Sequence, residues 1–129
     1  MDGKETFVGT VSLSGSGSTA IVVSIGEWHD DFIVTGWIDL SNMPSGAEVE
    51  LCMEFNMVPN QPQPSRLCSS YKSPSDAAPL YIKPMMLPRH ANMKITLSQT
   101  KGNGFDANYW IAIVVPDLGV KQWLMRRFA

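Results

Sequence analysis

The chain has 129 residues, of which 17% are charged, and its net charge is −2. This length predicts one domain, large enough to bury a core without disulfides or metals. Apart from Arg126 and Arg127 the basic residues are scattered, which argues against nucleic-acid binding. The sequence contains no run of roughly 18 apolar residues, the length that a membrane helix needs.

Apolar and polar residues alternate with a period of two along most of the chain, and Gly- and Pro-rich turns interrupt the alternation. This pattern is typical of short strands. The predicted strands span residues 6–13, 19–25, 32–40, 47–57, 65–71, 80–87, 92–100 and 106–115. Eight such strands favour an all-β domain over residues 1–117, an antiparallel β-sandwich like a jelly roll, with a small closed barrel as the alternative.

Local signals qualify some of these strands. The Gly- and Ser-rich turn at 14–18 predicts that the first two strands form a hairpin. Gly36 inside the third strand indicates a bulge or a close backbone approach, and Pro84 inside the sixth indicates an edge strand or a bulge. In the third strand, Phe32, Val34 and Ile38 are expected on one face.

The strand at 47–57 has the cleanest alternation. Val49, Leu51 and Met53 share one side with Phe55 and Met57, while three glutamates and Cys52 take the other. A sheet with one buried and one polar face has this pattern.

The two cysteines, Cys52 and Cys68, lie on consecutive predicted strands. A hairpin register that places Cys52 opposite Cys68 also places Glu54 opposite Arg66. Both faces are then well matched, so we predict that the cysteines are neighbours. A disulfide and a pair of free thiols both remain open, because the redox compartment is unknown.

Residues 118–129 break the alternating pattern. They form a C-terminal tail in which Val120, Trp123, Leu124 and Phe128 recur every three to four residues. This spacing fits a short amphipathic helix, and an extended arm is equally compatible. The tail is expected either to cap the domain's own core or to dock on a neighbouring subunit.

Trp37 and Trp110 both fall on the face opposite the aliphatic residues of their strands. A subunit interface or a small second core would account for them, because Trp is enriched at interfaces. An exposed platform on which sugar rings stack is the alternative interpretation.

No arrangement of residues predicts catalysis, a metal site or a cofactor. The cluster of carboxylates and one histidine at 27–31 lacks the ligand spacing of a calcium loop. The glutamates at positions 48, 50 and 54 line one side of a single strand, which is typical of a solvated face. None of the common nucleophile or phosphate-binding motifs occurs. We therefore expect no enzyme activity.

Three stretches, GWIDLSNMPSGAEV (36–49), APLYIKP (78–84) and MKITLSQTKG (93–102), resemble small all-β proteins encoded by archaea, their viruses and some phages. The resemblance covers roughly residues 32–114. It implies a virion or mobile-element context, and it assigns no functional residues.

These features favour a non-enzymatic structural subunit of a larger assembly: a capsid, decoration or accessory protein of a virion. Its partners would be copies of itself and other assembly subunits, and low charge limits repulsion between copies. A carbohydrate- or host-surface-binding module is the alternative. No secretory signal opens the chain, so we expect a location in the virion or, for a non-viral protein, in the cytoplasm.

Overall fold

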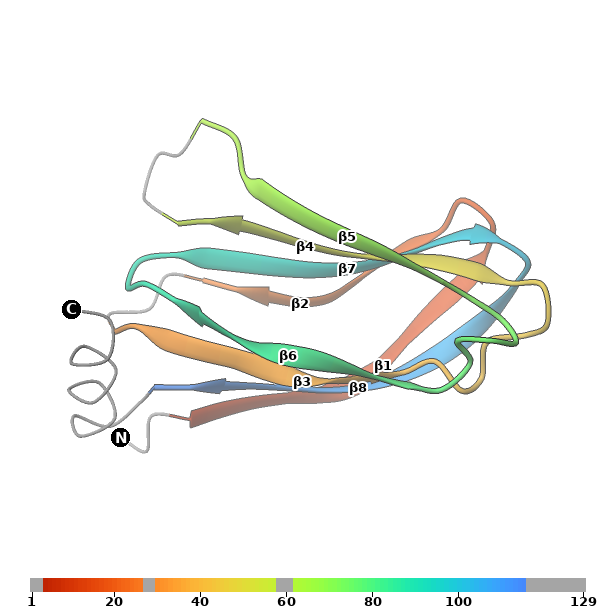
Figure 1. Ribbon diagram of the computed structural model, residues 1–129, viewed down its shortest axis with the longest axis horizontal. Helices are drawn as coiled ribbons and strands as arrows, with labels where there is room; N and C mark the ends of the chain where they lie inside the picture. Colours follow the sequence, from red (N-terminus) through yellow and green to blue (C-terminus); the bar gives the residue numbers. More distant parts are fainter. Residues whose placement is uncertain (1–3, 27–29, 58–61, 116–129) are drawn as a thin grey trace.

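The computed structural model describes residues 4–26, 30–57 and 62–115, which build two packed four-stranded antiparallel sheets (Figure 1). The strands are β1 (Lys4–Gly15), β2 (Thr19–Ile25), β3 (Phe32–Asp39), β4 (Glu48–Asn56), β5 (Ser65–Lys72), β6 (Pro79–Leu87), β7 (Asn92–Lys101) and β8 (Asn103–Val114). The predicted all-β sandwich of eight strands is confirmed.

The strand order is β1-β8-β3-β6 in one sheet and β2-β7-β4-β5 in the other. The pairs β4–β5, β3–β6, β2–β7 and β1–β8 are nested, so the first half of the chain pairs with the second half in reverse. A long ribbon of this kind, rolled into two sheets, is a jelly roll. The edge strands are β1 and β6 in the first sheet, and β2 and β5 in the second.

The predicted hairpin of the first two strands is wrong. β1 pairs with β8 and β2 with β7, so the turn between them passes from one sheet to the other. The turn is tied to β7 instead, because Gly17 N–H donates to the Gln99 carbonyl and Gln99 N–H donates to the Ser18 carbonyl, both at 2.8 Å. A short turn keeps two strands close together, but it does not decide whether they pair. The pairing partner of each strand depends on the rest of the sheet.

The core lies between the two sheets and contains the side chains that the alternation placed inward. Phe32, Val34 and Ile38 of β3 are fully buried, as are Ile95 and Leu97 of β7. β4 follows the predicted pattern at Val49 and Leu51, which are buried, and at the glutamates, which are partly exposed. Cys52 departs from it, because it lies on the side of the glutamates and is buried as well.

The bulge that Gly36 and Pro84 indicated is present in the β3–β6 ladder, where Thr35 alone stands opposite both Lys83 and Pro84. The register shifts between Val34 and Gly36, and Pro84 lies on β6 beside this irregularity. Pro84 is tolerated there because β6 is an edge strand.

Within the described part of the chain no helix is long and apolar enough to cross a membrane. The tail at 118–129, with Val120, Trp123, Leu124 and Phe128, lies outside the described residues.

Candidate functional site: an aromatic row across one sheet

Four apolar side chains line up across the outer face of the β1-β8-β3-β6 sheet. The register places Val8 opposite Trp110, Trp110 opposite Trp37, and Trp37 opposite Tyr81, one residue from each strand. Val8 is 69% exposed, Tyr81 67% and Trp37 37%, and Trp110 is half-buried between its neighbours. We call these four residues the aromatic row.

Two strands of the row, β3 and β8, approach one another closely at Gly36. Gly36 lies against the β8 backbone, where an added Cβ would come within 2.8 Å of the Ile111 Cα atom. Ile111 is fully buried in the core, so Trp110 beside it must point outward, and Trp37 beside Gly36 points the same way. The glycine therefore allows the two tryptophans to lie side by side.

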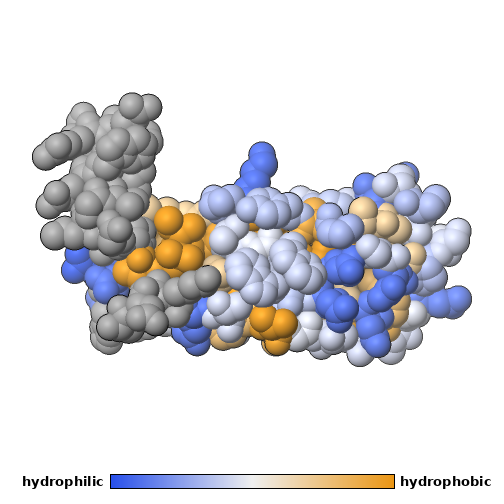
Figure 2. All heavy atoms as spheres, turned by 90° about the horizontal axis from the view of Figure 1, so that it is seen from below, coloured by the Kyte–Doolittle hydropathy of each residue, from blue (hydrophilic) through white to orange (hydrophobic). Residues whose placement is uncertain are grey.

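One end of this face is apolar and the other is polar, as Figure 2 shows. Pale, ring-shaped side chains occupy the middle, the largest hydrophobic group lies toward one end, and most hydrophilic side chains lie toward the other end, among paler ones. The register assigns Val114, Ile33 and the exposed Met86 to the apolar end, as a second row parallel to the first. Between the two rows lies a row of smaller side chains, Thr6, Ala112 and Thr35.

The polar end is built from β1, β3 and β8. The Thr10 hydroxyl donates to Asn108 Oδ1 at 2.6 Å, two residues along from the aromatic row. Asp39 lies on the same side of β3 as Trp37, and its Oδ1 accepts the Ser41 backbone N–H at 2.9 Å. Hydrogen bonds from the side chain and then the backbone of Ser41 lower the pKa of Asp39. A hydrogen bond to the carboxylate favours its charged form, so Asp39 is negative at neutral pH.

The outer face of the other sheet is different, because charges cover it. Glu54 pairs with Arg66 at 3.5 Å and with Lys94 at 3.9 Å, and Glu48 pairs with Lys101 at 3.8 Å. Such pairs suit a face that stays in water, whereas a contiguous apolar face is typical of an interaction site. The contrast identifies the aromatic row as the candidate functional surface.

Cys52 and Cys68 face each other in the β4–β5 pair and form a disulfide, with their Cα atoms 4.2 Å apart. The register is the one that the sequence predicted, with Glu54 opposite Arg66 and Met53 opposite Leu67. The bond joins the middle of β4 to the middle of β5, the two central strands of the nested ribbon.

The two cysteines also belong to a group of potential metal ligands. A carboxylate oxygen of Glu50 and both cysteine sulfurs lie within 4.8 Å of one another. Metals bind the thiolate form of cysteine, and neither sulfur is a thiolate in the disulfide. Arg66 Nη2 also lies 3.4 Å from Cys52 Sγ and adds a positive charge that opposes a cation.

Removing the disulfide is expected to lower the free energy of unfolding by about 2–3 kcal/mol, because it closes a loop between residues 16 positions apart. Urea unfolding of a Cys52→Ala/Cys68→Ala variant measures this. Reduction of the unchanged chain should produce a similar loss, and reductant should not affect the variant. An unchanged midpoint after verified reduction would contradict the prediction.

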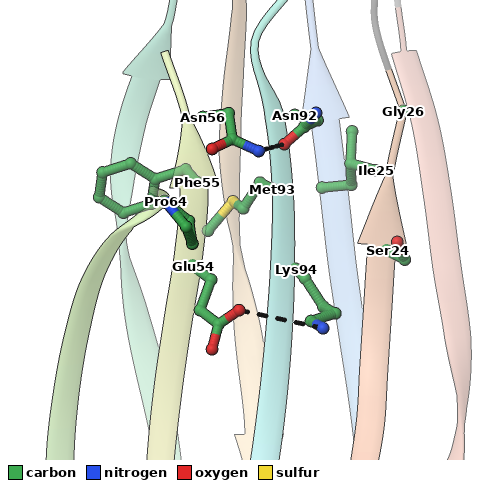
Figure 3. Close-up of a pocket in the computed structure, with 10 residues that line it drawn as sticks. All are labelled: Ser24, Ile25, Gly26, Glu54, Phe55, Asn56, Pro64, Asn92, Met93 and Lys94. Carbon is green, nitrogen blue, oxygen red and sulfur yellow. Dashed lines mark hydrogen bonds and ion pairs between the residues drawn. The ribbon is translucent and has the colours of Figure 1, made fainter. Parts of the chain in front are cut away.

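The described residues also line several recesses, and two of them bear on binding. The first, of about 330 Å³, lies at the end of the β2-β7-β4-β5 sheet (Figure 3). Figure 3 shows Glu54 paired with Lys94, and Asn56 Nδ2 donating to Asn92 Oδ1 at 3.0 Å. These polar groups are paired with one another, so the recess is better suited to binding a molecule than to acid–base catalysis.

The second recess, of about 420 Å³, is an apolar groove where the two sheets part between β5 and β6. Leu67, Tyr71 and Met85 are among the side chains that line it. Tyr81, the β6 member of the aromatic row, also lines this groove.

Sequence reasoning found half of the aromatic row. Trp37 and Trp110 point outward as expected, while Val8 and Tyr81 were not singled out. The available signal was an apolar residue on the outward side of each strand, but aligning the four requires a register between distant strands. Of the cluster at 27–31, residues 27–29 lie outside the described residues.

No family model and no curated protein matches the chain. The fold is similar to VP2 of infectious bursal disease virus in a subviral particle, with a TM-score of 0.52 at 9% identity over 87% of this chain and 32% of VP2. The T13 viral particle of that virus matches with a TM-score of 0.49 at 10% identity, over 88% of this chain and 31% of that one. A protein of Bacillus endospore appendages, which are disulfide-linked pili, matches with a TM-score of 0.39 at 9% identity, over 88% of this chain and 89% of its own.

The likeness to VP2 shows the fold. This chain spans about a third of the length of the viral proteins that it matches. At such low identity no residue role is transferred from them, because one fold carries many functions.

Proposed function

We propose that this protein is a non-enzymatic structural subunit of a virion, acting as a capsid, decoration or accessory protein. It works by burying the aromatic row against another subunit. The observation that carries the proposal is the exposure of this row on one face of the sandwich, while the other face bears ion pairs. The fold shared with VP2 and the resemblance to small viral and archaeal β-proteins support a virion context.

The size of the face fits such a role. A four-stranded sheet is about 20 Å wide with its side chains, and eight to ten residues of strand are about 30 Å long. This gives roughly 600 Å² per partner, close to one side of a small specific interface. Trp and Tyr are the residues that most often dominate binding energy in an interface.

Tyr81→Asp tests the proposal, because an exposed side chain can change without disturbing the core. We expect self-association, or association with the partner subunit, to weaken at least about 30-fold, since a buried anchor is replaced by an unpaired charge. Sedimentation velocity over a range of concentrations measures this. Ile21→Asp, at a 58% exposed position of β2, is the matched control and should leave association unchanged. Equal effects of both substitutions would contradict a role for the row.

A glycan-binding module is the second candidate, and the polar end of the face favours it. Thr10, Asn108 and Asp39 lie beside the tryptophans, where they could hydrogen-bond a sugar stacked on the rings. A glycan array probed with the intact protein tests this. Binding by a stable monomer that disappears in Trp37→Ala would favour this candidate over the assembly proposal.

A further inference from the structure

The charge of the chain is divided unevenly along its length. Residues 116–129 contain one acid, Asp117, and three bases, Lys121, Arg126 and Arg127, so this segment carries +2. Since the whole chain carries −2, the remainder carries −4. A basic segment with apolar residues therefore follows directly after an acidic domain.

Two acids of that domain lie at the polar end of the aromatic face. Asp39 follows Trp37 by two positions on β3, and Asp106 precedes Trp110 by four on β8, so both lie on the outer side with the tryptophans. Asp106 is exposed and Asp39 half-buried. We call these two the acidic pair. Among the residues whose side chains are described, Lys83 is the cation of this face, and it lies on the other side of the row.

We propose that residues 120–128 of a neighbouring copy dock on this face. The apolar residues of the segment, Trp123, Leu124 and Phe128, cover the aromatic row. Arg126 and Arg127 reach the acidic pair. The inference rests on the proposed function and names the partner for the same surface.

Dimensions and chemistry support this occupant. The row and Asp106 are four residues apart along β8, about 13 Å, and a nine-residue helix would have about the same length. A guanidinium can also stack on a tryptophan ring while it hydrogen-bonds a carboxylate. A segment with aromatic and arginine side chains thus matches both parts of the face.

The segment also begins at the right place to connect copies. It follows β8, whose last residue, Val114, belongs to the apolar row of the same sheet. If each copy donates its segment and receives another, the contact is head-to-tail. Contacts of this kind close into rings or extend into filaments, as a structural subunit requires.

Charge reversal in full-length protein tests the inference. The face variant is Asp39→Lys/Asp106→Lys, and the segment variant is Arg126→Glu/Arg127→Glu. Each alone should associate at least about 30-fold more weakly, because like charges then meet. An equimolar mixture of the two variants should regain association to within about threefold, since each segment then meets a face of opposite charge. Sedimentation velocity measures both effects.

Controls separate the inference from the proposed function. Glu48→Lys/Glu50→Lys reverses two charges on the other sheet and should change nothing in assembly, and thermal unfolding checks that every variant is folded. If the mixture stays dissociated while a chain carrying all four substitutions recovers, the segment docks on its own domain and the inference is wrong. If Tyr81→Asp weakens assembly and the segment variant does not, another partner covers the row. If the unchanged protein never assembles, the proposed function itself fails.

Discussion

Phe32→Ala is expected to lower the free energy of unfolding by about 4 kcal/mol, a large share of the stability of a domain of this size. Phe32 begins β3 and is fully buried, among the largest side chains of the core. Its removal loses the free energy gained by transferring an aromatic ring from water into the core. It also leaves a cavity between two sheets, each of which is held by a hydrogen-bonded ladder. The sheets can collapse only partly onto such a cavity, so most of the loss should be observed.

Urea unfolding at one fixed protein concentration measures this effect, because association with other copies would also stabilise the folded state. Ile21→Ala is the control, since it removes an apolar side chain that is 58% exposed and should change stability by less than about 0.5 kcal/mol. A loss below about 1.5 kcal/mol for Phe32→Ala would show that the space between the sheets is not tightly packed at this position.

Gly36→Ala adds only one methyl group, yet it is expected to lower the free energy of unfolding by at least about 3 kcal/mol. The backbone φ of Gly36 is +156°, and a Cβ would overlap the Trp110 carbonyl oxygen. β3 and β8 would have to separate, which disrupts the alignment of Trp37 and Trp110. The variant should therefore lose stability, with a change in tryptophan fluorescence before unfolding, and the proposed assembly should weaken with it.

Substitutions at two other glycines distinguish steric overlap from backbone strain as the source of this loss. Gly26→Ala should be nearly neutral, because no atom lies within 4 Å of its added Cβ and its φ is ordinary. Gly46→Ala also has open space, but its φ is +85°, so it should cost only about 1–2 kcal/mol of backbone strain. If Gly36→Ala resembles Gly46→Ala, the close approach of β3 and β8 is not needed for the fold.

The aromatic row connects these stability arguments to function. Its position depends on a bulge at Gly36 and on a buried residue, Ile111, that turns Trp110 outward. An interface built on a sheet is held more rigidly than one built on loops, so little conformational entropy is lost when it is covered. This rigidity would suit the proposed role, in which every copy presents the same surface.

The amino-acid sequence alone determined most of the buried strand residues and the strand pair that forms the central hairpin. The side chains of a strand alternate between its two faces, so the inward residues of β4 and β7 could be recognised from local pattern. The β4–β5 register followed from Cys52, Cys68, Glu54 and Arg66, because a hairpin brings together residues that are close in the chain.

The tertiary structure alone decided the partners of β1 and β2 and the alignment of Val8, Trp110, Trp37 and Tyr81. Both depend on pairing between strands up to about a hundred residues apart in the chain. No local sequence pattern specifies which of the distant strands will pair. That choice is made by the core as a whole, since strands are ordered so that all inward faces are buried at once. The candidate site therefore became visible only when the two halves of the chain were paired.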